Sequence, residues 1–201
     1  MKTIINDVTG NWKNVKNKCR TTVNKQYSEI EATSKFKNDL LISEHSPIRL
    51  INVDWSWKSI AYWLSTEWSR HKFEKFISTQ RTDRTGIDRA DIGQGAKVNF
   101  DGYSNAQSLI DAWRKRLCGC AATEAIVLAR DFKIALHQFE PELADVLVPN
   151  CIYRCGCPEF SNKCYIWENF KENNPNIDMT NIRARYYAYN KSVYKKMVVQ
   201  K

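Results

Sequence analysis

The sequence lacks long apolar runs. No stretch approaches the roughly 20 consecutive apolar residues that a transmembrane helix needs, and the N-terminal residues MKTIINDVTGNWKNVK hold no apolar segment typical of a secretory signal. Glycine and proline are scarce, with 7 and 5 residues among 201, which excludes collagen-like and low-complexity chains. We also find no internal repeat. These absences favour a globular, cytoplasmic protein.

The chain is instead rich in apolar and basic residues. Hydrophobic residues make up 43% of it and include seven tryptophans, which suffices for a core. The formal net charge is +9, and such a charge attracts anions, whether nucleic acid or phosphate-bearing nucleotides. At roughly 150 residues per domain, the length indicates one domain. We expect that domain over residues 1–170, with a linker and a basic, tyrosine-rich helix over 171–201.

Hydrophobic periodicity predicts both helices and strands. Helical spacing begins at Trp12 and Ser34 and recurs over residues 60–71, 104–117, 121–139 and 181–194, whereas residues 51–57, 73–79 and 152–154 are predicted strands. Residues 82–102 resemble a long surface loop, and 171–177 a linker. Trp55, Trp57, Trp63 and Trp68 are expected in the core. The mixture indicates the α/β (α+β) class, with a small mixed sheet flanked by helices.

A cluster of cations follows the predicted helix at residues 60–71. Its members are Arg70, His71, Lys72, Lys75, Arg81 and Arg84. Cations at a helix end and along the next strand can bind an anion, because arginine makes bidentate contacts to phosphate. Ser78 and Thr79 add hydroxyl donors. The simpler alternative is a basic helix end that interacts favourably with the helix dipole.

The stretch from His45 to Arg84 resembles the flavin-dependent thymidylate synthase family. That family carries RHRxxSxNExSxRY, often after a helix that ends in Gln-Trp-x-Arg-His-Arg, and here EWSRHK occupies residues 67–72. His45 precedes the strand as a family histidine does, and Thr79-Gln80-Arg81 is similar to the hydroxyl-x-Arg pair. Residues 143–149 with Ile152-Tyr153 resemble a further family stretch, so the resemblance covers residues 40–155.

Several positions depart from the family pattern. Lys72 replaces the last arginine of the triplet, Glu67 stands where a glutamine is usual, and Phe76-Ile77 occupies the place of Asn-Glu. The C-terminal family segment has no clear match, although residues 181–185 supply arginines. The resemblance is therefore to a short, divergent branch such as those of phages and prophages.

The resemblance implies a reaction and a set of site residues. In the family, dUMP is reductively methylated to dTMP: methylenetetrahydrofolate gives the carbon, reduced FAD the hydride, and NADPH reduces the flavin again. The implied FAD-binding residues are His45, Arg70, His71 and Lys72, with His45 also near the folate. Thr79 and Arg81 are the implied catalytic residues, which polarise the pyrimidine. The implied substrate-binding residues are Glu67, Ser78, Gln80, Arg84 and Arg154.

The resemblance also implies a homotetramer with sites between subunits. Two alternatives stay open on the same fold. The missing Asn-Glu favours a nucleotide-binding protein that has lost catalysis. The +9 charge and the basic residues from Arg183 to Lys196 favour a protein that binds nucleic acid or modifies its bases.

The seven cysteines are spread unevenly along the chain. They are Cys19, Cys118, Cys120, Cys151, Cys155, Cys157 and Cys164. The last four have the spacing C-x3-C-x-C-x6-C, which could hold zinc tetrahedrally, but this is not the paired C-x2-C form. Without a secretory signal we expect reduced thiols and no metal site.

Overall fold

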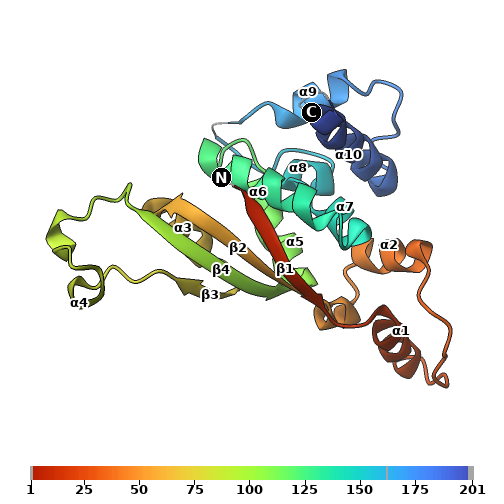
Figure 1. Ribbon diagram of the computed structural model, residues 1–201. Coiled ribbons are helices and arrows are strands. Elements are labelled where there is room, and N and C mark those ends of the chain that lie inside the picture. The colour runs from red at the N-terminus through yellow and green to blue at the C-terminus, as the bar shows by residue number, and fades with distance from the viewer. Residues whose placement is uncertain (1, 162, 199–201) are drawn as a thin grey trace.

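The chain folds around one four-stranded sheet. The computed structural model describes residues 2–161 and 163–198, with side chains up to Lys195, so the side chain of Lys196 in the predicted basic tail lies outside the described residues. The strands are β1 (Thr3–Thr9), β2 (Asn52–Ala61), β3 (Glu74–Ile77) and β4 (Lys97–Asn105). Their order is β1-β2-β4-β3 (Figure 1). The α+β class is confirmed, and all three described pairings are antiparallel where a mixed sheet was expected.

Helices lie between the strands and after the last strand in the chain. In chain order they are α1 (Trp12–Thr21), α2 (Ser34–Ile42), the short 3-10 helix η1 (Ser46–Leu50), α3 (Tyr62–Ser69), α4 (Thr82–Thr85), η2 (Arg89–Asp91), α5 (Ala106–Arg116), α6 (Thr123–Leu136), α7 (Pro141–Val146), α8 (Asn150–Arg154), α9 (Ile166–Glu172) and α10 (Ile182–Val198). No helix in the described part of the chain is long and apolar enough to cross a membrane.

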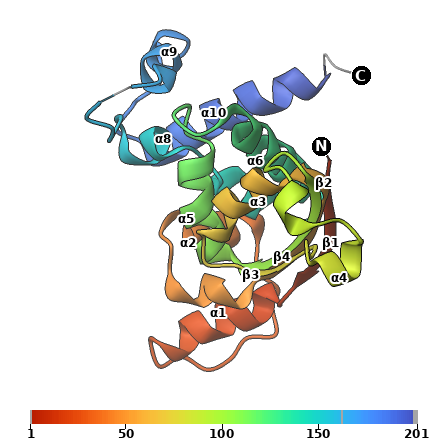
Figure 2. The same cartoon turned by 90° about the vertical axis from the view of Figure 1, so that its left-hand side faces the viewer.

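Aromatic side chains cover one face of the sheet. The Trp55 ring on β2 lies 6.2 Å from Trp113 of α5 and 5.2 Å from Phe132 of α6. Trp57 lies 4.8 Å from Trp68 of α3. Helices α3, α5 and α6 therefore pack on this face (Figure 2). Trp55, Trp57 and Trp68 are fully buried as expected, and edge-on aromatic pairs of this kind add stability beyond their buried area.

A glycine on β4 makes room for this core. A Cβ at Gly102 would lie 2.2 Å from the Trp55 ring, so a larger residue there would displace the tryptophan. The opposite face of the sheet is open in the single chain and carries both polar and apolar side chains. It carries the Lys58–Asp101 ion pair, at 3.0 Å, and the side chain of Phe76, which is 72% exposed.

The loop predicted over residues 82–102 was wrong for its last six residues, 97–102. Residues 97–105 form β4, which pairs with both β2 and β3. Along β4 the residues Val98, Phe100, Gly102 and Ser104 are buried in strict alternation with more exposed neighbours. Gly102 and Ser104 occupy two of these inward positions, so the apolar alternation that marks a strand is not visible in the sequence.

The strand predicted at residues 152–154 was also wrong, because these residues lie in helix α8. Pro149 directly precedes α8, and its carbonyl accepts from the Ile152 backbone N–H at 3.0 Å. Cys155 ends the helix with a positive φ of 58°. Three residues are too few for periodicity to separate a strand from one helical turn. The predicted linker at 171–177 also begins later, because α9 continues to Glu172.

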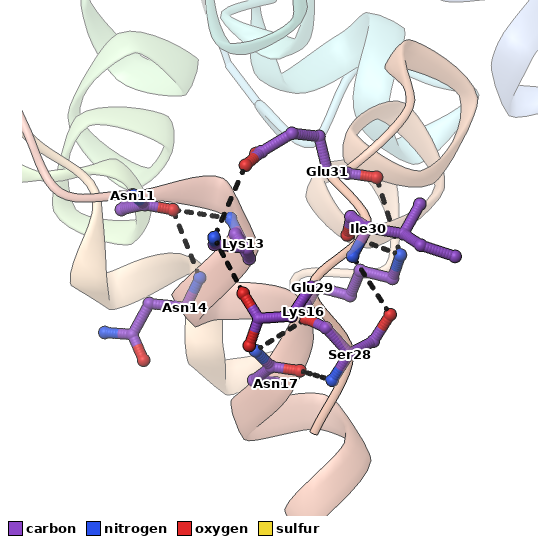
Figure 3. A network of polar contacts seen from close by, with 9 residues as sticks. All are labelled: Asn11, Lys13, Asn14, Lys16, Asn17, Ser28, Glu29, Ile30 and Glu31. Carbon is purple, nitrogen blue, oxygen red and sulfur yellow. Dashed lines mark hydrogen bonds and ion pairs between the residues drawn. The ribbon is translucent and has the colours of Figure 1, made fainter. Parts of the chain in front are cut away.

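The segment that follows α1 is tied along that helix. Asn17 of α1 donates to the Ser28 carbonyl at 3.1 Å and accepts from the Ser28 N–H at 2.8 Å. Lys13 pairs with Glu29 at 3.2 Å, and Lys16 donates to a backbone carbonyl of the same segment at 2.9 Å (Figure 3). These contacts hold a segment without regular secondary structure against α1.

The C-terminal helix α10 packs against α7 and α8. Arg185 donates to the backbone carbonyls of Ile152 and Tyr153, at 2.7 and 2.9 Å. The Asn190 amide donates to the Asp145 carbonyl at 3.0 Å, and the Tyr194 hydroxyl lies 3.0 Å from the Asp145 carboxylate. The basic helix is thus joined to the body of the chain by buried polar contacts.

Candidate active site

The end of α3 positions the first group of predicted site residues. Helix α3 carries Glu67 in its last turn, ends at Ser69 and is capped by Arg70. His71 follows, and its backbone N–H donates to the Trp68 carbonyl at 3.1 Å. Glu67 and His71 are four residues apart, so they lie on the same side of the chain as it leaves the helix. The fully buried Trp68 ring between them anchors this turn to the core.

Arg116 joins these two residues from the end of α5. Its Nη1 donates to Glu67 Oε2 at 3.0 Å, and its Nη2 donates to the Glu67 backbone carbonyl at 2.7 Å. Its Nε donates to His71 Nε2 at 2.8 Å. Because Nε2 accepts a hydrogen bond, His71 is neutral and carries its proton on Nδ1. The structure therefore brings together Glu67 and His71 around an arginine that the sequence reasoning did not select.

Burial and neighbouring charge keep His71 neutral. The pKa of His71 is lowered to about 4. Burial is the largest cause, and the positive charges of Arg116, Lys115 and Lys75 contribute in the same direction. Burial also lowers the pKa of Arg116, as does the charge of Arg70, while Glu67 opposes the shift. Several positive groups therefore converge on one turn of chain, although one of them is already paired with Glu67.

An anion from solution can reach the cations around this turn. Arg70, Lys72, Lys75 and Lys115 are all exposed. Together with the Nδ1–H of neutral His71 they form a set of donors. Lys75 donates to the Phe73 carbonyl at 3.4 Å, and the nearby Glu67 carboxylate is held by Arg116; within the described residues the four cations form no ion pair. This donor set fits a diphosphate or another multiply charged anion.

A second group of predicted residues lies at the start of the loop after β3. Ser78, Thr79 and Gln80 line a hollow of about 400 Å³, closed on its other side by Ile87 and Ile92 among others. The Ser78 hydroxyl accepts from the Asn99 backbone N–H at 2.9 Å. Thr79 accepts from the Arg81 N–H at 3.2 Å. In Figure 1 this loop, with α4 at its tip, projects away from the body of the chain.

Two arginines of the loop, Arg81 and Arg84, share the Asp83 carboxylate. Arg81 donates to both oxygens of Asp83, at 3.0 and 2.9 Å, and Arg84 lies 3.7 Å from the same group. All three side chains are more than half exposed, so solvent screens the pairs and they contribute little stability. Arg81, the predicted catalytic arginine, is thus partly neutralised within its own loop.

The remaining predicted residues lie apart from both groups. His45 is exposed at the start of η1, with its Nδ1 3.9 Å from the Cys19 sulfur. Arg154 on α8 donates to Asn150 at 3.1 Å. The single chain therefore does not bring all the predicted residues into one pocket.

A partly buried ion pair that the sequence did not predict lies next to His45. Arg114 of α5 pairs with Glu44 and lies 3.5 Å from the centre of the Tyr153 ring. The Arg114 guanidinium holds the pKa of Glu44 below its ordinary value even though burial acts in the opposite direction. The one sequence signal for Arg114 and Arg116 is the run of cations that ends α5, and basic last turns are common.

Comparisons with known proteins agree with this fold. No protein-family model matches the sequence. No curated protein matches it. Solved structures do match, among them a flavin-dependent thymidylate synthase ThyX from Helicobacter pylori complexed with FAD and dUMP. That match has 16% identity and a TM-score of 0.55, and it covers 69% of this chain and 97% of that one.

A second Helicobacter pylori ThyX structure, also with FAD and dUMP, is similar at 15% identity and a TM-score of 0.59. The match covers 73% of this chain and 99% of that one. At these identities the likeness establishes the fold. The chain therefore has the fold of the flavin-dependent thymidylate synthases, as the resemblance in its sequence implied.

Proposed function

We propose that the protein is a divergent flavin-dependent thymidylate synthase, which converts dUMP to dTMP with methylenetetrahydrofolate as carbon donor and NADPH as reductant. The observation that carries the proposal is the Glu67–Lys72 run, which lies at a helix end on this fold and is surrounded by exposed cations. The ThyX neighbours are complexed with FAD and dUMP, and both ligands carry the phosphates that such a donor set suits.

The residues at the end of α3 would hold FAD. Arg70 and Lys72 supply charge to its diphosphate, and His71, kept neutral by burial and by Arg116, offers its Nδ1–H. When bound, reduced FAD supplies the hydride of the reaction. His45 is proposed to lie beside the flavin and the folate once a second subunit completes the site.

The loop after β3 would hold the pyrimidine nucleotide. Ser78, Gln80 and Arg84 are proposed to bind dUMP together with Glu67, and Arg154 would come from a neighbouring subunit. Thr79 and Arg81 would orient and polarise the ring. For this, Arg81 must exchange its contact with Asp83 for the substrate, which is feasible because the pair is exposed.

A second candidate is a nucleotide-binding protein that no longer catalyses the reaction. Phe76-Ile77 in place of Asn-Glu removes a carboxylate from the pyrimidine side, and Asp83 neutralises Arg81. A nucleic-acid-binding or base-modifying role rests on the +9 charge and the basic helix α10. For each of these roles we propose that the protein is located in the cytoplasm.

An anaerobic assay with dUMP, methylenetetrahydrofolate, FAD and NADPH separates these candidates. We expect dTMP to form. Arg81→Ala should lower turnover about a hundred- to a thousand-fold, the usual effect of removing one polarising donor, and leave FAD affinity unchanged. Arg89→Ala, in the same exposed loop, is the matched control and should keep full turnover. Binding of FAD and dUMP without dTMP would favour the non-catalytic candidate.

A further inference from the structure

Three cysteine thiols from distant parts of the chain meet beyond the end of α5. Cys118 and Cys120 lie in the connection between α5 and α6, and Cys164 lies in the segment before α9. Their Sγ atoms all lie within 4.8 Å of one another. This set differs from the four late cysteines with the C-x3-C-x-C-x6-C spacing. It includes Cys164 but has Cys118 and Cys120 of the α5–α6 connection in place of Cys155 and Cys157.

The backbone is shaped for this approach. The Ala121 N–H donates to the Cys118 carbonyl at 3.0 Å, which closes a turn and places Cys118 and Cys120 close together. A Cβ on Gly119 would lie 2.8 Å from the Cys164 Cβ and 3.0 Å from its sulfur. The segment that carries Cys164 therefore passes directly over Gly119, at a distance that only glycine permits.

We propose that Cys118, Cys120 and Cys164 bind a zinc ion. Zinc–thiolate bonds of about 2.3 Å in a tetrahedron separate the sulfurs by about 3.8 Å, so side-chain rotation suffices to close a cluster that spans 4.8 Å. A disulfide needs sulfurs about 2.05 Å apart and joins two of them, which leaves the third thiol unexplained. Cys151 at the start of α8, or a water molecule, would take the fourth position.

Such an ion would act as a structural cross-link. It would join the α5–α6 connection to the segment between α8 and α9, where residues 155–165 have no helix or strand among those described. Cys118 lies two residues after Arg116. The ion would therefore also fix the end of α5, from which Arg116 donates to Glu67 and His71. Helix α9 follows Cys164 directly and would be fixed at its start.

Metal analysis of the 201-residue chain, expressed with added zinc and desalted, tests the proposal. We expect one zinc per chain in the wild type and at least a tenfold loss in Cys164→Ser. Cys155→Ser is the matched control, because Cys155 lies in the same segment but donates to the Met179 carbonyl instead, and it should keep the ion. A wild type without zinc, or a Cys164→Ser variant that retains it, overturns the proposal.

Cobalt substitution of the wild type tests the site without any variant. A thiolate-to-cobalt charge-transfer band is expected, and its intensity distinguishes three thiolates from four. The absence of this band overturns the proposal. So does a disulfide between any two of the three cysteines in freshly purified, unreduced protein, detected by alkylation and mass spectrometry.

Discussion

Replacing Arg116 with leucine should destabilise the protein and raise the pKa of His71. The change removes three hydrogen bonds, two to Glu67 and one to His71. Removing one partner of a buried pair costs about 3–5 kcal/mol, whereas exposed pairs contribute about 1 kcal/mol or less. The Arg116 and Glu67 side chains are 15% and 27% exposed, so we expect an intermediate loss of about 2 kcal/mol.

Urea unfolding and a nuclear magnetic resonance titration of His71 measure the two effects. With a denaturant slope of about 2 kcal/mol per molar, typical of small proteins, the midpoint should fall by about 1 M. The pKa of His71 should rise above 4 but stay below 6.5, because burial, the largest cause of its lowered pKa, remains in the variant. In the Glu67→Leu background the same change should cost less. An unchanged midpoint, or an unmoved His71, would refute this account of Arg116.

Three further predictions concern titration and assembly. Between pH 6.5 and 4 the unfolded chain binds a proton at His71 that the folded chain does not, so the free energy of unfolding should decrease by about 3 kcal/mol as the pH is lowered across this range. In unfolding experiments at several pH values, His71→Asn should remove this pH dependence, and the control His45→Asn should retain it. Burial lowers the pKa of Lys133 from 10.5 to about 7, so the free energy of unfolding should rise as the pH is raised across that range. If the Lys133→Met variant showed the same rise, Lys133 would not be its cause. Light scattering should give about four times the 23.5 kDa of one chain; a monomer at micromolar concentration excludes the expected homotetramer.

Much of the central fold could be predicted from local patterns. Trp55 and Trp57 alternate with polar residues along β2, and the buried Trp68 follows a helical period on α3. These signals are strong because each pattern repeats over several residues of one element. The strand β4 was missed because Gly102 and Ser104, which are not apolar, fill two of its inward positions. At Gly102, packing against Trp55 requires a residue without a side chain.

The candidate site could be predicted only where its residues are close in sequence. Arg70, His71 and Lys72 form one continuous run, which a short motif can reveal. Arg116 could not be found in this way, because its contact with His71 depends on how α5 packs against α3 through the Trp68–Trp113 pair, 5.0 Å apart. The cysteine cluster escaped the sequence reasoning for the same reason.

Binding of FAD tests the central claim most directly. FAD is titrated by calorimetry into the wild type, Arg70→Ala and the control Arg130→Ala, which removes an exposed arginine of α6. Losing one charge-assisted phosphate contact costs about 1.5–3 kcal/mol, so Arg70→Ala should bind FAD about ten- to a hundred-fold more weakly. Arg130→Ala should match the wild type. Equal affinity in all three proteins, or no FAD binding by any of them, would contradict the account.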